Sequence, residues 1–198
     1  LLTTFLTSQL SSLDRMQTSY NGAGTGNARI SSSSTLDGIG GNLQNIPKGA
    51  FRRMFLPEPN HTLIKCDLNQ AEVRVVAWIG PIPYLIERYS NDPSFDIHRW
   101  NARNIFNKPE GEITRDERAI GKAGVHGGNY GLGYRKAALL YGIPDSQARS
   151  AIETYRNNLP EIQLWWGRVQ RQLHETRILS SPLWRRRVFL ERFDEELY

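Results

Sequence analysis

The stretch from Thr114 to Tyr130 constrains the fold more than any other, because it combines a strong helix start with residues that helices usually avoid. Thr114 and Glu117 have the reciprocal capping-box spacing that opens a helix. Four glycines follow, and each costs about 1 kcal/mol relative to alanine inside a helix. Such glycines indicate that a backbone or a ligand approaches closely, or that the helix moves and partly unwinds. They are Gly121, Gly124, Gly127 and Gly128.

The same stretch carries a ladder of side chains, defined as Arg118, Lys122, His126 and Tyr130. Residues four apart lie about 40° from one another around a helix, so the ladder spans roughly 18 Å along one side. Two cations precede two planar rings, an order suited to holding a triphosphate while a base stacks on a ring. The alternative is a solvated basic stripe that ends in a half-buried tyrosine. The glycines favour the ligand-binding interpretation.

A second pattern lies at residues 65–80, KCDLNQAEVRVVAWIG. Residues 62–68 predict a strand, and a helix follows from about Asn69 with Val73, Val76 and Ala77 on one face. Asp67 stands at the junction, where a metal ligand can be held rigidly, although on spacing alone a helix N-cap is the commoner use of aspartate. Glu72 can face the same cavity or simply sit on a solvated helix face.

The first part of the chain contains little periodicity. Residues 8–50 are rich in Ser, Gly, Asn and Thr, and predict a docked, ordered loop, with a flexible linker as the alternative. Pro81 and Pro83 break the helical pattern that follows Asp67. A shift in composition near residues 81–95 predicts the boundary between a mixed α/β part and a helical part.

The second half predicts mainly helices. Asp96 can cap a helix that runs to about Phe106, and the capping box opens the next helix. Further helices are predicted from residue 145 or 146 to 158 and from Pro160, which suits a first helical turn, to about 176. Residues 177–192 predict two strands around a Ser-Ser-Pro turn.

Composition limits the setting. A chain of 198 residues with 39% hydrophobic content can bury a core, and a net charge of +5 with a pI near 9.5 favours a polyanionic partner. The single cysteine, Cys66, excludes an internal disulfide framework, and no apolar run is long enough to span a bilayer. We therefore expect a soluble protein in a reducing compartment. The opening Leu-Leu, without a methionine, suggests a fragment or a processed product.

Taken together, these patterns resemble the polymerase domain of the family A DNA polymerases, the DNA polymerase I family. TSYNGAGTGNARISSS at residues 18–33, followed by NLQNIP at 42–47, resembles the region that joins thumb to palm. CDLNQAEVRVVAWIG resembles motif A, and Arg118-x-x-x-Lys122 with Tyr130-Gly131 resembles motif B. DIHRWNARNIF at residues 96–106 adds the Asp-Ile-His element. The matches occur in the family's order over about residues 17–190.

The resemblance implies an α/β (α+β) chain with the right-hand polymerase fold, comprising part of the palm sheet and a helical fingers subdomain. The expected organisation is a thumb-palm connection at residues 1–28, a palm part with motif A at 29–95, and fingers with motif B and a basic hairpin at 96–198. A bacteriophage-type member is expected, located in the cytoplasm of a bacterial or phage-infected cell, with no membrane association.

The resemblance also implies residue roles. Asp67 binds two Mg²⁺ ions, with Mn²⁺ as an alternative, assisted by the carbonyl of Leu68. Arg118 and Lys122 hold the incoming phosphates, and Lys122 also protonates the departing pyrophosphate. Contacts to the incoming dNTP or the template base are implied for Gln70, Glu72, His98, His126 and Tyr130. Glu72 disfavours ribonucleotides, and Gln70 supports it. Contacts to primer-template DNA are implied for Arg29, Gln44, Asn45, Arg185, Arg186 and Arg187, the last three with a solvated run as the alternative.

The sequence departs from the family at two places. His126 replaces a stacking phenylalanine or tyrosine, and adds a ring whose charge can vary around neutral pH. Motif C, which carries the second metal-binding aspartate, is absent, as are the thumb and any exonuclease; Asp194 does not fit as its replacement. Either the sequence stops before motif C, or a second polypeptide supplies motif C in a split polymerase, which is the arrangement that we expect. The alternatives are a non-catalytic accessory subunit that binds nucleic acid, and a related single-subunit RNA polymerase.

Overall fold

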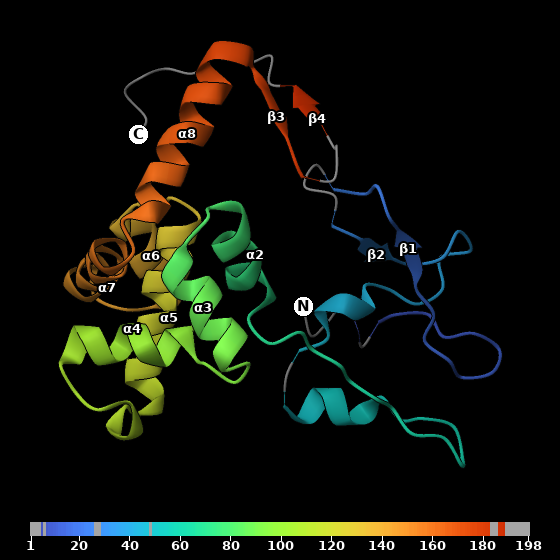
Figure 1. Cartoon of the computed structure of the whole chain (residues 1–198). Coiled ribbons are helices and arrows are strands. Elements are labelled where there is room, and N and C mark those ends of the chain that lie inside the picture. The colour runs from blue at the N-terminus through green and yellow to red at the C-terminus, as the bar shows by residue number, and fades with distance from the viewer. Residues whose placement is uncertain (1–4, 6, 26–28, 48, 183–185, 189–198) are drawn as a thin grey trace. The chain divides into compact units, whose positions relative to one another are not determined.

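The computed structural model describes residues 5, 7–25, 29–47, 49–182 and 186–188 (Figure 1). They divide into two compact units, with the division between Asp67 and Leu68. This division precedes the boundary predicted near residues 81–95, because the segment after Leu68 packs with the later helices. The assignment of residue ranges to thumb connection, palm and fingers stays a prediction.

The first unit consists mainly of loops. Strands β1 (Ser19–Asn21) and β2 (Ser31–Ser33) pair antiparallel, and the 3₁₀ helices η1 (Leu43–Asn45) and η2 (Ala50–Met54) follow. Ser32 is buried, and its hydroxyl donates to Oδ1 of Asn42 over 2.7 Å, which fastens the strand pair to the NLQNIP segment. This contact shows order within the loop predicted at residues 8–50, and its docking stays a prediction.

The strand predicted at residues 62–68 is wrong. These residues have no regular structure, and their apolar side chains are exposed, as Ile64 at 84% and Leu68 at 81% show. A strand forms only where a neighbouring strand pairs with its backbone. The strands in the described part of the chain pair only as β1 with β2 and β3 with β4, so residues 62–68 have no partner there.

The second unit is helical and ends in a short hairpin. Its elements are α2 (Ala71–Ile79), α3 (Pro83–Asn91), α4 (Ile97–Phe106), η3 (Glu110–Glu112), α5 (Arg115–Asn129), α6 (Tyr134–Tyr141), α7 (Asp145–Asn158), α8 (Glu161–Thr176), β3 (Ile178–Ser180) and β4 (Arg186–Val188). The helices predicted from the Asp96 cap, the capping box, residue 145 and Pro160 are confirmed, and so is the strand pair after α8.

Two α-helices of the described residues, α3 and α6, were not predicted. Pro83 was interpreted as a break, but it occupies the first turn of α3, where its missing N–H costs nothing. Helix α6 is short and ends at Gly142, whose φ of 64° is the left-handed conformation that commonly follows a helix. Gly142 is the residue from which the end of α6 could have been predicted in the sequence.

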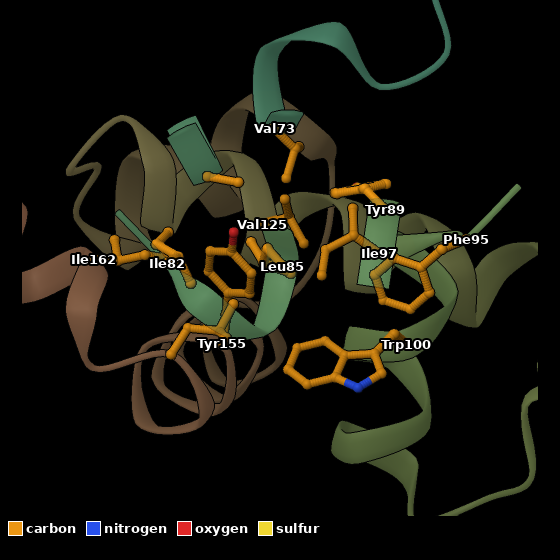
Figure 2. Close-up of a cluster of buried hydrophobic side chains, with 12 residues drawn as sticks. Val73, Ile82, Leu85, Tyr89, Phe95, Ile97, Trp100, Val125, Tyr155 and Ile162 are labelled. Carbon is orange, nitrogen blue, oxygen red and sulfur yellow. The ribbon is translucent and has the colours of Figure 1, made fainter. Parts of the chain in front are cut away.

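The core of the second unit joins α2, α3, α4, α5 and α7. Figure 2 shows the side chains of Val73, Leu85, Val125 and Tyr155 gathering in one cluster. Tyr155 is fully buried, and its hydroxyl donates to Oδ1 of Asn129 over 3.0 Å. The apolar face predicted for α2 is thus confirmed, with Val73 and Ala77 buried and Val76 packed against the cluster.

The glycines of α5 are explained by helix packing. A Cβ on Gly121 would lie 2.2 Å from the carbonyl oxygen of His98 in α4, and one on Gly124 would lie 2.4 Å from that of Ala151 in α7. Gly127 and Gly128 meet the side chains of Ile152 and Tyr155 in the same way. Close approach of other helices therefore accounts for all four positions, and α5 is held between α4 and α7.

Among the described helices, none combines the length and apolar character needed to cross a membrane.

Candidate functional site

The side of α5 away from the glycines carries the ladder. Lys122 is exposed, Arg118 and His126 are half-buried, and Tyr130 is 49% exposed one residue beyond the last residue of the helix. The glycine face fixes this arrangement, because it packs against α4 and α7 and leaves only the opposite side open. The side chains of the ladder therefore lie along one side of α5, as the sequence predicts.

Asp96 links α4 to the ladder. Its Oδ1 accepts hydrogen bonds from the backbone N–H groups of His98 and Arg99 and so caps α4, as predicted. Its Oδ2 accepts from Nε of Arg118 over 2.6 Å. Burial raises the pKa of Asp96, but the bonds from Arg118 and Arg99 and the positive charge of Arg118 outweigh it and lower the pKa overall. Asp96 is therefore a carboxylate that orients the Arg118 guanidinium.

His98 lies beside the same guanidinium, with its Nδ1 3.4 Å from Nη2 of Arg118. Burial lowers the pKa of His98 to about 4; the opposing charge of Asp96 is the next largest influence, and Arg118, His126 and Lys122 lower the pKa further. A guanidinium only donates, so Nδ1 accepts and the neutral ring carries its proton on Nε2. No described residue is a hydrogen-bond partner for this buried Nε2. His98 therefore presents an N–H donor next to Arg118.

His126 lies at the centre of a ring cluster formed with His98, Tyr130 and Tyr141. The ring centroids lie 5.8 Å from His98, 6.4 Å from Tyr130 and 6.0 Å from Tyr141, all in edge-to-face geometry. Nδ1 of His126 is 2.7 Å from the hydroxyl of Tyr141 in α6. Burial and then Lys122 lower the pKa of His126, against the opposing charge of Glu72. The lowered pKa displaces the change of charge predicted around neutral pH to lower pH.

Gln70 joins three elements at the start of α2. Its Nε2 donates to the carbonyl of Phe95 over 3.2 Å, and its Oε1 accepts from the hydroxyl of Tyr89 and the N–H of Ile97. Gln70 also adopts a left-handed φ of 51° as the N-cap residue of α2. The side chain thus sets where α2 begins relative to α3 and α4, and it places the next turn, which carries Glu72.

Glu72 shares the neighbourhood of the ring cluster, since its charge raises the pKa of both His126 and Tyr141. It also lines an apolar groove of about 410 Å³. The groove lies between α2, the end of α5 and α8, and is lined by Ala71, Glu72, Val75, Val76, Asn129, Tyr130, Trp165 and Trp166. Trp166 is anchored there by donation from Nε1 to the carbonyl of Gly128. The groove therefore combines one carboxylate with aromatic walls.

The first unit contributes different candidates. Asp67 lies in an exposed segment without regular structure, and the N-cap of α2 is Gln70, so Asp67 is neither at a strand end nor a helix cap. Gln44 and Asn45 are exposed in η1, and Arg29 is exposed, with its backbone N–H donating to Oγ1 of Thr25 over 2.8 Å. These candidates all belong to the first unit.

A magnesium site is incomplete within the described residues. No group of three or more His, Cys, Asp or Glu side chains gathers there. Two divalent ions repel each other, and more than one carboxylate is needed to hold them. Asp67 and the Leu68 carbonyl therefore do not form a complete site by themselves.

The basic hairpin carries Arg187 on β4, exposed and opposite Leu179, while Arg186 is opposite Ser180. Arg185 and Asp194 lie outside the described residues.

Two residues of the site were missed from the sequence. Asp96 was predicted only as a cap, and its bond to Arg118 spans 22 residues. Tyr141 carries no sequence signal for its contact with His126, because both the helix α6 and its packing had to be known.

Comparison with known proteins identifies the family that this sequence matches. Residues 2–196 match the sequence profile of DNA polymerase family A. The chain is 30% identical over 180 residues to DNA polymerase I of Synechocystis sp., covering 88% of this chain and 17% of that protein. It is 29% identical over 181 residues to DNA polymerase I of Pseudomonas aeruginosa, covering 89% and 19%. The chain thus spans less than a fifth of the length of these relatives.

A solved structure is also similar. The POL domain of Pol1 from M. smegmatis, in complex with DNA primer-template and dNTP, matches with a TM-score of 0.75 and 28% identity. The match covers 94% of this chain and 32% of that one. The predicted polymerase fold class is confirmed, as a mainly helical chain with small sheets.

Proposed function

This chain belongs to DNA polymerase family A, and we propose that it carries the nucleotide-binding part of a DNA polymerase that adds dNTPs to a primer 3′ end on a DNA template. The observation that supports this most directly is the oriented set of donors on α4 and α5. Asp96 holds Arg118, Arg118 sets the tautomer of His98, and Lys122 is exposed one turn further along.

These donors suit a triphosphate. Phosphoryl transfer depends on positioning and on neutralising charge that spreads over phosphate oxygens. Arg118 offers a planar fork of N–H groups, Lys122 a mobile ammonium, and His98 a neutral N–H. We assign all three to the phosphates, and Lys122 also donates a proton to the departing pyrophosphate. Because Asp96 and the glycine packing fix the frame beforehand, little reorganisation is needed when the nucleotide binds.

The rings and Glu72 suit the base and sugar. His126 stacks on the incoming nucleotide and Tyr130 lies near the templating base, while Glu72 occupies the space where a 2′-hydroxyl would project. Gln70 holds the start of α2 and so supports Glu72. If this is right, Glu72→Ala raises ribonucleotide incorporation, whereas Glu87→Ala, at another glutamate outside the site, does not. Unchanged incorporation in Glu72→Ala would contradict the assignment.

The remaining contacts concern metal, DNA and a partner. Asp67 and the carbonyl of Leu68 supply part of a Mg²⁺ site, with Mn²⁺ as an alternative ion, and carboxylates from another segment or a second polypeptide complete it. Bound Mg²⁺ neutralises phosphate charge. We assign Arg29, Gln44, Asn45 and the arginines at 185–187 to primer-template DNA. We propose a split polymerase as the arrangement. We further propose that it is of bacteriophage type and that it acts in the cytoplasm.

A non-catalytic accessory subunit is the second candidate. The incomplete metal site within the described residues favours it. The donor set on α5 favours catalysis, because binding DNA alone does not require a guanidinium, an ammonium and a neutral imidazole arranged for a triphosphate.

Primer extension tests the proposal. The chain alone, the complex purified with its native partners, and that complex with Asp67→Ala are compared on a primed DNA template with Mg²⁺ and dNTPs. We expect extension by the intact complex and its loss in Asp67→Ala and Lys122→Ala. Lys136→Ala, which removes an exposed lysine of α6, is the matched control and keeps activity. No extension by an intact complex that binds DNA would favour the accessory subunit.

A further inference from the structure

We propose that Tyr141 positions the ring of His126 for the incoming nucleotide. This inference rests on the proposed function, since His126 must contact the nucleotide. It adds a residue from α6, a helix that carries none of the residues assigned above.

The contact between the two residues is short and specific. The hydroxyl of Tyr141 lies 2.7 Å from Nδ1 of His126, and both side chains are half-buried. The rings meet edge to face at 77° with centroids 6.0 Å apart. A ring held by both a hydrogen bond and an edge contact has one preferred plane. The stacking surface of His126 is therefore fixed from the side of α6.

The bond also selects a tautomer. A tyrosine hydroxyl donates or accepts, and a neutral imidazole has one N–H and one acceptor nitrogen. Donation from Tyr141 satisfies Nδ1 and leaves the proton on Nε2. The reverse bond would leave the phenolic proton without an acceptor among the described residues, where Tyr141 makes no other hydrogen bond. We therefore assign the Nε2–H tautomer, whose donor is available to an oxygen of the nucleotide.

The position of His126 makes such a partner necessary. A phenyl ring at this place would have no polar atom, whereas imidazole brings two nitrogens into a cluster of rings. Leaving one unpaired in a partly dehydrated site is costly. Tyr141 pairs Nδ1, so a histidine can present the flat surface that stacking needs together with one directed donor.

Variants separate this hydrogen bond from general packing. Tyr141→Phe removes only the hydroxyl, and Tyr134→Phe, on the same helix, is the matched control. His126→Phe removes the nitrogens, and the double variant His126→Phe/Tyr141→Phe tests whether the hydroxyl acts through them. In the native complex, the KM for the incoming dNTP should rise about three- to ten-fold in Tyr141→Phe, with a smaller change in kcat. The KM should not change further in the double variant relative to His126→Phe.

A second measurement does not depend on extension. Nitrogen-15 spectra of the chain should show the Nε2–H tautomer of His126, a mixture of tautomers in Tyr141→Phe, and the parent pattern in Tyr134→Phe. Titration with dGTP should shift the His126 nitrogens in the parent and shift them less in Tyr141→Phe. Absence of extension in every variant would contradict the proposed function. Parent-like spectra and a parent-like KM in Tyr141→Phe, or an equal effect in the His126→Phe background, would overturn the inference.

Discussion

Asp96 and Arg118 form a hydrogen-bonded ion pair that fastens the start of α4 to the second turn of α5. Nε of Arg118 donates to Oδ2 of Asp96 over 2.6 Å, while Oδ1 of the same carboxylate caps α4. One side chain therefore fixes both a helix terminus and the direction of a cation. A mutation at Asp96 should therefore change both the stability of the fold and the binding of a nucleotide.

Two substitutions at Asp96 should separate these effects. Asp96→Asn keeps an oxygen for the cap but loses the charge, so we expect dNTP affinity to fall about three- to ten-fold with little change in Tm. Asp96→Ala should lose the same affinity and, in addition, about 1 kcal/mol of unfolding free energy. Titration with dNTP and thermal unfolding measure the two quantities. Asp116→Asn, an exposed aspartate in the first turn of α5, is the charge control, and an equal loss of affinity there would refute the coupling.

Adding a methyl group to the glycine face of α5 should separate packed helices. Gly121→Ala and Gly124→Ala place a Cβ 2.2 and 2.4 Å from the backbone oxygens of His98 and Ala151, which cannot swing aside. We expect each to lower the free energy of unfolding by at least about 2 kcal/mol. Gly167→Ala in α8 meets nothing within 4 Å and should instead stabilise by about 0.5–1 kcal/mol. Urea unfolding measures the change in unfolding free energy for all three variants. A change in the same direction for Gly121→Ala and Gly167→Ala would contradict the packing explanation.

His98 should make the fold sensitive to acid. Burial, with the nearby cations, lowers its pKa from 6.5 to about 4 in the folded chain, so protonation favours the unfolded state. The contribution of His98 to the free energy of unfolding is therefore fully present above pH 6.5. It is lost as the pH drops toward 4, and amounts to on the order of 3 kcal/mol. His126 acts in the same direction, since its pKa is also lowered.

Unfolding by urea at several pH values tests this dependence. His98→Gln should reduce the slope of stability against pH between about 6.5 and 4.5. His126 and the carboxylates whose pKa is lowered, Asp92, Asp96 and Glu117, contribute to the slope that remains. His61→Gln changes an exposed histidine of the first unit and should leave the slope as it is. A parent-like slope in His98→Gln would show that His98 does not titrate as described.

Removing the Gln70 side chain should loosen the start of α2. Gln70→Ala leaves the hydroxyl of Tyr89 and the N–H of Ile97 without their acceptor, so we expect a loss of about 2 kcal/mol in unfolding free energy. Gln163→Ala, at an exposed position of α8, should change stability by less than about 0.5 kcal/mol. Hydrogen exchange of the α2 amides would locate the effect. Amide protection in α2 of Gln70→Ala equal to that of the parent chain would argue against it.

The parts of the candidate site that were predicted from the sequence are those governed by short-range rules. The cap at Asp96, the capping box of Thr114 and Glu117, and the four-residue spacing of the ladder each depend on residues within one or two turns. The presence of α4, α5, α7 and α8 followed from the same rules. Such signals remain visible in one sequence because helical hydrogen bonds and caps connect near neighbours.

Only the tertiary structure decided the rest, since the relevant partners are distant in the chain. Residues 62–68 have an apolar strand composition but no strand beside them in the described residues, and α3 and α6 are stabilised by packing against neighbouring helices. The reason for the α5 glycines became clear only when His98 and Ala151 were placed against them. The pairs Asp96 with Arg118 and Tyr141 with His126 join residues 22 and 15 apart. Composition and spacing determined the helices and the chemistry they carry, whereas packing between helices determined which of those side chains meet.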